Sequence, residues 1–207
     1  IPRENVSIVP NGVDISLYRF QTHVGSEKNP ILLFVGNFSW MQNRVALTYL
    51  VNELWPSILK RHAQATLRII GKELPGELKN LVSRAGIEFL KDVSDMTEEY
   101  HRADLLIAPI QVGGGTNFKI LEAMASGLPV VTSGIGVGGL GVQHKKHIMR
   151  ADTVTEYVDA IDSVLSNRVA TLSMTKNARK LIEEKYSWLM IAKKLEDVWR
   201  MVYEKRS

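Results

Sequence analysis

Short apolar runs alternate in this chain with longer segments whose apolar residues recur at helical spacing, and this alternation constrains the fold most. The candidate strands are residues 6–9, 31–36, 67–70, 87–90, 105–109 and 129–132. Strands that are separated by helices pair in parallel, because the chain crosses back over the sheet before each new strand. Residues 31–36 and 105–109 are almost continuously apolar, which is typical of strands covered by helices on both faces. The sequence therefore predicts an α/β fold with a doubly wound, mostly parallel sheet of about six strands.

The predicted helices lie between these strands and after the last of them. Residues 43–62 have a helical pattern in which Pro56 places a kink or a restart, and residues 78–85 and 97–102 are shorter candidates. Residues 116–126 are apolar nearly all round, so we expect that helix to be buried. Three further helices, at 155–165, 170–184 and 189–204, form a helical C-terminal tail. No repeat or long linker divides the 207 residues, so the chain is predicted to be one domain.

Composition excludes several functional classes. The 45% apolar and 23% charged residues are those of an average globular protein, and no run of about 18 apolar residues could span a membrane. The absence of cysteine excludes disulfides, thiol catalysis and thiolate metal sites. The first residues, IPRENVSIVP, carry neither an initiator Met nor a signal peptide, so we expect a piece of a longer, cytoplasmic protein, with the inner face of the membrane as the alternative location.

The net charge of +4 leaves two interpretations open. It is either a solvated surface with a slight cationic excess or a sign of an anionic partner, such as a phosphorylated ligand, a lipid-linked acceptor or a membrane surface. No basic stripe is interleaved with aromatic residues, so no nucleic-acid partner is predicted.

Two glycine-containing loops mark the predicted ligand site. In an open parallel sheet, ligands bind beyond the carboxyl ends of the strands. Gly36 and Asn37 follow one apolar strand, and the run Gly113, Gly114 and Gly115 follows the other and leads into the predicted helix 116–126. Glycines let backbone amides approach a ligand closely, and the unpaired amides of a helix N-terminus attract an anion. We expect Thr116 to be the N-cap of that helix.

One polar stripe runs along the helix, formed by Thr116, Lys119, Glu122 and Ser126, which fall within about 120° of one another. Lys119 lies in the first turn, where the helix dipole disfavours a cation, and Lys before Glu is the less favourable order for a helical pair. A diphosphate at the loop would remove both disadvantages and free Glu122 to accept hydrogen bonds from a ribose diol. The alternative is an ordinary strand-to-helix turn with a Lys–Glu pair and no ligand.

Five segments resemble the carboxyl-terminal domain of the family-four glycosyltransferases. They are IVPNGVD (8–14), ILLFVGNFSWMQN (31–43), LRIIGKE (67–73), GGGTNFKILEAMASGLPVVTSGIGVGGL (113–140) and KYSW (185–188). These are retaining enzymes with two Rossmann-like domains that face each other across a cleft, the GT-B architecture. The G-G-G-T run is most similar to a polysaccharide-assembly branch. The resemblance implies that this chain is a single Rossmann-like domain, half of that architecture, and that residues 187–207 form a terminal helix that packs toward a missing N-terminal domain.

In that family the second domain binds a nucleoside-diphosphate sugar, and the first binds the acceptor. Glu122 matches the second glutamate of a paired motif, which holds the ribose. The loop 113–116 matches the one at the diphosphate and donor sugar, and Gly36 matches a glycine that approaches the phosphates. The predicted donor-binding residues are Gly36, Asn37, Gly113, Gly114, Gly115, Thr116, Asn117, Lys119 and Glu122. No catalytic residue is assigned, no D-x-D pattern implies a metal, and the nucleotide sugar is a substrate, so no cofactor is predicted.

The chain departs from the family pattern at four positions. The first glutamate of the pair is replaced by Gly114, and the places of two basic residues of the first loop hold Asn37 and Gln42. A basic residue after the G-G-G-T is replaced by Asn117. Lys119 is then the cation expected at the phosphates, with Arg44 as a weaker second. Either backbone amides hold most of the phosphate charge, or the donor binds weakly, or the protein is non-catalytic.

Three other motifs have simpler interpretations. Residues 136–141 spell G-x-G-x-x-G but lack the following helix and acidic residue of a dinucleotide site, so a loop lining the donor pocket is preferred. His144 and His147 are flanked by lysines, so a surface turn is preferred to a metal site. Trp40 and Met41 form either an apolar wall of the cleft or simple packing.

The resemblance thus implies a retaining glycosyltransferase that moves a sugar from a nucleoside-diphosphate donor to a hydroxyl acceptor, which is a carbohydrate or is linked to lipid. The isolated domain should bind nucleotide, with the base near the backbone of residues 90–93, and turn over little alone. The alternatives are a non-catalytic nucleotide-sugar-binding or partner-docking module, a sugar-nucleotide epimerase and a dinucleotide oxidoreductase.

Overall fold

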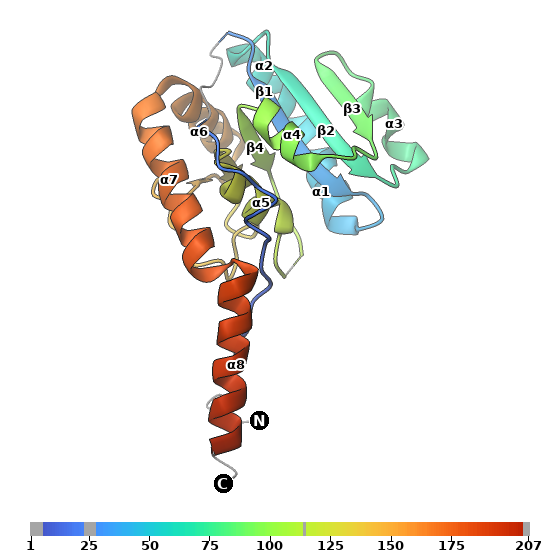
Figure 1. Ribbon diagram of the computed structural model, residues 1–207. Helices are drawn as coiled ribbons and strands as arrows, with labels where there is room; N and C mark the ends of the chain where they lie inside the picture. Colours follow the sequence, from blue (N-terminus) through green and yellow to red (C-terminus); the bar gives the residue numbers. More distant parts are fainter. Residues whose placement is uncertain (1–5, 23–27, 114, 205–207) are drawn as a thin grey trace.

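The computed structural model describes residues 6–22, 28–113 and 115–204, which form a six-stranded sheet flanked by helices (Figure 1). The strand order is β3-β2-β1-β4-β5-β6, and every neighbouring pair is parallel. This confirms the predicted doubly wound α/β fold. The strands are β1 (Ile31–Asn37), β2 (Thr66–Lys72), β3 (Ile87–Lys91), β4 (Leu105–Ala108), β5 (Val130–Thr132) and β6 (Met149–Arg150).

One predicted strand is wrong, and one strand was missed. Residues 6–9 form no strand, and Val6 and Ile8 are 56% and 76% exposed, because no sheet edge lies beside them to receive their backbone. The sixth strand is instead β6, which pairs with β5 through Met149 and Arg150. A strand of two residues is too short to produce a recognisable apolar pattern.

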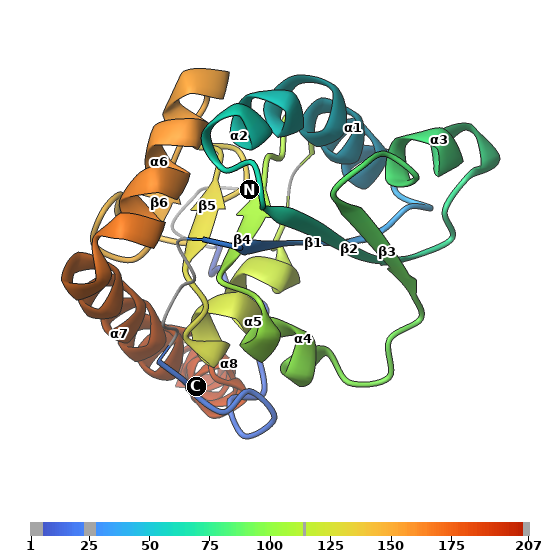
Figure 2. The same cartoon turned by 90° about the horizontal axis from the view of Figure 1, so that it is seen from above.

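The helices cover both faces of the sheet, as Figure 2 shows from above: α1, α2, α3 and α6 lie on one face, and α4, α5 and α7 on the other. Their bounds are α1 (Met41–Tyr49), α2 (Trp55–Arg61), α3 (Lys79–Val82), α4 (Met96–Arg102), α5 (Phe118–Ser126), α6 (Val154–Ser166), α7 (Arg168–Lys185) and α8 (Trp188–Glu204). A short 3₁₀ turn, η3 (Gly76–Leu78), precedes α3. The core is therefore two layers, one on each side of the buried strands.

The predicted break at Pro56 is a change of helical register. A π-helical turn, η2 (Leu50–Leu54), joins α1 to α2, so the chain stays helical from Met41 to Arg61. Pro56 lies in the first turn of α2, where its missing N–H is tolerated.

Helix α5 is buried as expected, but it begins later than predicted. Asn117 occupies the N-cap position, and its side chain caps nothing. The predicted Thr116 cap is wrong because residue 116 precedes the N-cap position, and its Oγ1 accepts a hydrogen bond from Asn11 Nδ2 at 3.4 Å. The helix ends at Gly127, whose φ of +82° is the left-handed conformation that glycine favours.

Helix α8 extends away from the body of the domain (Figure 1). Its base is fixed by backbone hydrogen bonds from Val13 N–H to Tyr186 O at 2.7 Å and from Trp188 N–H to Val13 O at 3.3 Å. Ile191 is its one buried residue within the described chain. None of the helices seen in residues 6–22, 28–113 and 115–204 has the length and apolarity that a membrane crossing requires.

Candidate functional site

Both predicted loops emerge at the point where the sheet reverses its winding. β1 and β4 are neighbours, with Leu32 opposite Leu105 and Leu33 opposite Leu106. The chain leaves β1 toward α1 on one face and β4 toward α5 on the other (Figure 2). The carboxyl ends of two such strands diverge, and the crevice between them is where doubly wound folds bind ligands.

The carboxyl end of β1 is packed against the first turn of α1. Gly36 and Asn37, which were predicted to form the loop after this strand, are its last two residues, because both pair with β2. Gly36 is buried, and a Cβ at this position would lie 3.1 Å from Asn43 Cγ, which leaves little room for a side chain. Asn37 is exposed, and its Oδ1 accepts a hydrogen bond from Ser39 N–H at 2.9 Å. Its carbonyl oxygen accepts one from Asn43 Nδ2 at 2.7 Å, so Asn43 fixes the end of this strand.

The glycine loop after β4 approaches α1 from the other side. Gly113 and Gly115 have φ of +118° and +91°, which side chains rarely adopt. A Cβ at Gly113 would lie 3.3 Å from Gln42 Cβ, whereas one at Gly115 would meet open space. Gly114 lies outside the described residues. The loop therefore rests on α1 at one end and faces an open region before α5.

Lys119 connects α5 to α1. Its Nζ donates a hydrogen bond to Asn43 Oδ1 at 2.7 Å and lies 5.5 Å from the centroid of the Phe34 ring. Burial lowers the pKa of Lys119 from 10.5 to about 8, and the nearby Glu122 charge partly opposes that effect. Asn43 thus connects the Lys119 ammonium group to the end of β1.

Glu122 lies one turn further along α5 and is partly buried. Its Oε2 accepts a hydrogen bond from the phenol of Tyr100, on α4, at 2.7 Å. Burial first, and then the Glu122 carboxylate, raise the pKa values of Tyr18 and Tyr100, so both phenols remain protonated donors. The carboxylate therefore points neither into the apolar core nor freely into solvent, and its contact with a ribose stays a prediction.

Asn117 connects the glycine loop to the loop after β5. Its Nδ2 donates a hydrogen bond to Gly136 O at 2.8 Å. Gly136 begins the G-x-G-x-x-G run, which forms turns and is followed by no helix before α6. The dinucleotide interpretation of that run therefore lacks its structural context.

The two histidines of the neighbouring turn bind backbone groups. His144 Nδ1 accepts a hydrogen bond from Arg150 N–H at 2.9 Å, and His147 Nδ1 accepts one from Gln143 N–H at 3.0 Å. Across the described ranges, no three histidine, aspartate or glutamate side chains are placed to hold a metal ion together.

The structure thus brings Gly36, Asn37, Gly113 and Lys119 together around the first turn of α1. Asn43 and Tyr100 were missed by the sequence analysis. A polar residue at a buried position of the first turn was a usable signal for Asn43, whereas no local pattern connects Tyr100 to Glu122.

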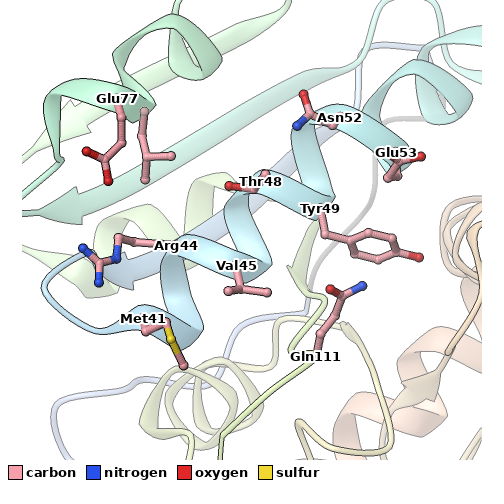
Figure 3. Close-up of a pocket in the computed structure, with 10 residues that line it drawn as sticks. Met41, Arg44, Val45, Thr48, Tyr49, Asn52, Glu53, Glu77 and Gln111 are labelled. Atoms are coloured by element: carbon pink, nitrogen blue, oxygen red, sulfur yellow. The ribbon is translucent and has the colours of Figure 1, made fainter.

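A pocket of about 460 Å³ lies along the outer flank of α1 and η2 (Figure 3). It contains Arg44, the second cation considered above, and Met41, but none of the predicted donor-binding residues lines it. Its lining is Met41, Arg44, Val45, Thr48, Tyr49, Asn52, Glu53, Glu77, Leu78 and Gln111. Arg44 therefore lines a pocket to which Lys119 does not contribute.

Comparison with known proteins shows the family to which this chain belongs. The family model described as Glycosyl transferases group 1 matches residues 29–167. An uncharacterized glycosyltransferase of Methanocaldococcus jannaschii is 31% identical, over 98% of this chain and 56% of its own length. The chain spans about half the length of the curated relatives it matches.

Two solved structures share the fold. Anabaena HepE in complex with UDP and glucose superposes with a TM-score of 0.74 at 18% identity, covering 94% of this chain and 56% of HepE. The C-terminal domain of a glycosyl transferase group 1 family protein from Francisella tularensis superposes with a TM-score of 0.63 at 16% identity, covering 86% of this chain and 100% of that domain.

Proposed function

This chain belongs to the glycosyl transferases group 1 family as the C-terminal, donor-binding half of a GT-B fold, and we propose that it binds a nucleoside-diphosphate sugar where β1 and β4 diverge. The observation that carries the proposal is the meeting of the end of β1, the glycine loop and Lys119 at Gln42 and Asn43, in the first turn of α1. A glycine loop, a helix N-terminus and a lysine are elements that bind phosphate in other proteins.

The diphosphate would lie at the start of α5. No side chain caps this helix within the described residues, and its first turn contains no acidic residue. Free amides and the positive end of the dipole therefore attract an anion, and Lys119 adds a full charge beside them. Groups fixed before the reaction and aimed at a departing diphosphate stabilise the charge that develops on it.

Glu122 would hold the ribose. One of its oxygens is occupied by Tyr100, and a carboxylate has enough lone pairs to accept further hydrogen bonds from vicinal hydroxyls. The distance of one helical turn between Lys119 and Glu122 suits a nucleotide whose phosphates lie at the helix start and whose ribose lies deeper.

The complete protein would transfer the sugar with retention to a hydroxyl acceptor, which is a carbohydrate or is linked to lipid, bound by a first domain. Helix α8 would pack against that domain, because it exposes large apolar side chains to solvent. Among them are Trp188, Leu189 and Trp199. A cytoplasmic location, at or away from the membrane, stays a prediction.

A thermal-shift panel of UDP, GDP, ADP and their sugars tests this proposal. A ligand that binds only the folded chain raises its melting temperature. Glu122→Ala should abolish the shift given by the best ligand, whereas Glu196→Ala, an exposed glutamate paired with Arg200 on α8, should leave it unchanged. An undiminished shift in the Glu122 variant would remove this residue from the ribose.

A non-catalytic nucleotide-sugar-binding module is the second candidate. It is favoured by Gly114, Asn37 and Gln42, which stand where the family pattern has a glutamate and two basic residues. Hydrolysis of the donor by the full-length protein would identify an enzyme, and its absence together with retained binding would favour the module.

A further inference from the structure

Glu122 is hydrogen-bonded from an element outside the predicted site. Tyr100 lies on α4, which packs against α5, and its side chain is entirely buried. Its phenol donates to Glu122 Oε2 at 2.7 Å. A hydrogen bond from a buried phenol restricts rotation of the Glu122 carboxylate and uses one lone pair of one of its two oxygens.

Tyr18 approaches the same carboxylate from a segment without regular structure. Burial first, and then the nearby Glu122 carboxylate, raise the pKa of Tyr18, so its phenol stays protonated beside that carboxylate. The rings of Tyr18 and Tyr100 meet edge to face, with their centroids 6.0 Å apart.

The segment that carries Tyr18 is fixed by hydrogen bonds to three helices. Arg179 Nη1, on α7, donates to Tyr18 O and to Ala125 O, both at 2.7 Å. On α4, His101 Nε2 donates to Arg19 O at 2.8 Å. Gln21 N–H donates to Ser126 O, the last residue of α5, at 3.0 Å. Tyr18 is therefore held in place before any ligand arrives.

Resting on the function proposed above, we propose that Tyr100 and Tyr18 are positioning residues that aim the Glu122 carboxylate at the 2′,3′-diol of the bound nucleoside diphosphate. They do not touch the ligand themselves. They fix the acceptor oxygen, so the domain recognises ribose hydroxyls through a carboxylate with one allowed orientation. The positioned carboxylate would therefore make the domain select ribonucleotides over their deoxy forms.

A ligand cycle tests this inference with the 207-residue chain. Calorimetric titration with UDP, GDP and ADP identifies the tightest ligand, which is then compared with its 2′-deoxy and 3′-deoxy forms. We expect the wild type to bind the ribonucleotide about tenfold or more tightly than either deoxy form, the loss expected for a hydrogen bond to a charged group. In Tyr100→Phe this ratio should fall to about threefold or less, because the ribonucleotide loses more affinity than either deoxy form, which keeps only one hydroxyl for Glu122 to bind.

Two more variants, one further test of the positioning role and one control, complete the experiment. Tyr18→Phe should lower the ratio in the same direction, and because Tyr18 is only partly buried this variant keeps its fold if Tyr100→Phe does not. Tyr186→Phe is the matched control, since its buried phenol donates to Leu140 O at 2.7 Å, away from Glu122. That control should leave the ratio unchanged.

The outcomes separate this inference from the function on which it rests. If Glu122→Ala abolishes the preference but Tyr100→Phe and Tyr18→Phe keep it, the positioning role is overturned and the proposed function stands. Equal losses of affinity for ribose and deoxyribose ligands in the tyrosine variants would likewise overturn it. If the wild type binds none of the nucleotides, or if Glu122→Ala keeps the preference, the role of Glu122 at the ribose fails and this inference fails with it.

Discussion

Raising the pH from 7 to 9 should weaken nucleoside-diphosphate binding, because Lys119 loses its proton in this range. Burial beside Phe34 lowers the pKa of Lys119 to about 8, and Glu122 partly opposes this effect. Its hydrogen-bond partner, Asn43, is neutral and cannot titrate. The charge proposed to face the phosphates is therefore largely present at pH 7 and largely lost at pH 9.

The magnitude follows from this pKa. About nine tenths of the chains carry the Lys119 charge at pH 7 and about one tenth at pH 9. If the charged form alone binds the diphosphate, affinity falls about tenfold, or ~1.4 kcal/mol. Stability should move in the opposite direction. A lysine whose pKa is lower in the folded state than in the unfolded state makes the unfolded chain bind more protons, so the free energy of unfolding rises with pH between about 8 and 10.5.

Calorimetric titrations at pH 7, 8 and 9, with urea denaturation of the ligand-free chain at the same pH values, measure both trends. Lys119→Met should bind the nucleotide more weakly at pH 7 and show neither trend. Any pH dependence of binding that remains in this variant comes from groups other than Lys119, such as the nucleobase, and is subtracted from that of the wild type. Lys119→Arg keeps its charge throughout and should also lose the pH dependence. An unchanged wild-type affinity between pH 7 and 9, or the same slope in Lys119→Met, would refute the reasoning.

Three further changes have distinct expected results. Asn43→Leu removes the link between Lys119 and the end of β1 and should weaken nucleotide binding about tenfold in calorimetry. Asp162→Ala removes a carboxylate of α6 that lies 2.6 Å from the Nε2 of His62, beside the end of α2, and should lower the free energy of unfolding in urea by about 1–3 kcal/mol, with nucleotide affinity unchanged. Trp199→Ser should change the stability of this chain by less than about 0.5 kcal/mol, since Trp199 is 67% exposed, but should lower the melting temperature of the full-length protein if α8 packs on the first domain.

The sequence predicted best those elements that are buried on every side. β1 and β4 lie in the centre of the sheet, where Leu32, Leu33 and Leu106 are fully buried, so their composition alone identifies them. Residues 6–9 are also a short, mostly apolar run, but such a run forms a strand only where a sheet edge is available for pairing. β6 is specified by such an edge, beside β5, and not by its own two residues.

The place of the candidate site could also be predicted, because it depends only on strand order. The partners of its side chains could not. Lys119 meets a residue 76 positions earlier, and Glu122 meets one 22 positions earlier, so no helical or strand periodicity relates them. Only the fold brings α1, α4 and α5 together. Asn43 is marked locally by its polarity at a buried position of α1, but that signal does not name its partner, and Tyr100 on α4 has no local signal at all.

These internal partners bear on how the site would bind. Lys119 has three donor hydrogens and Asn43 takes one; Glu122 accepts from Tyr100 on one oxygen and keeps lone pairs for other donors. A ligand can therefore bind both groups without breaking either contact, and the side chains have already lost much of their rotamer freedom before it arrives. Ordering a long side chain at an interface costs about 0.5–1.5 kcal/mol, so partners that order it in advance raise affinity without touching the ligand. It follows that substitutions at Asn43 and Tyr100 should weaken nucleotide binding even though the residues proposed to contact the ligand, such as Lys119 and Glu122, are unchanged.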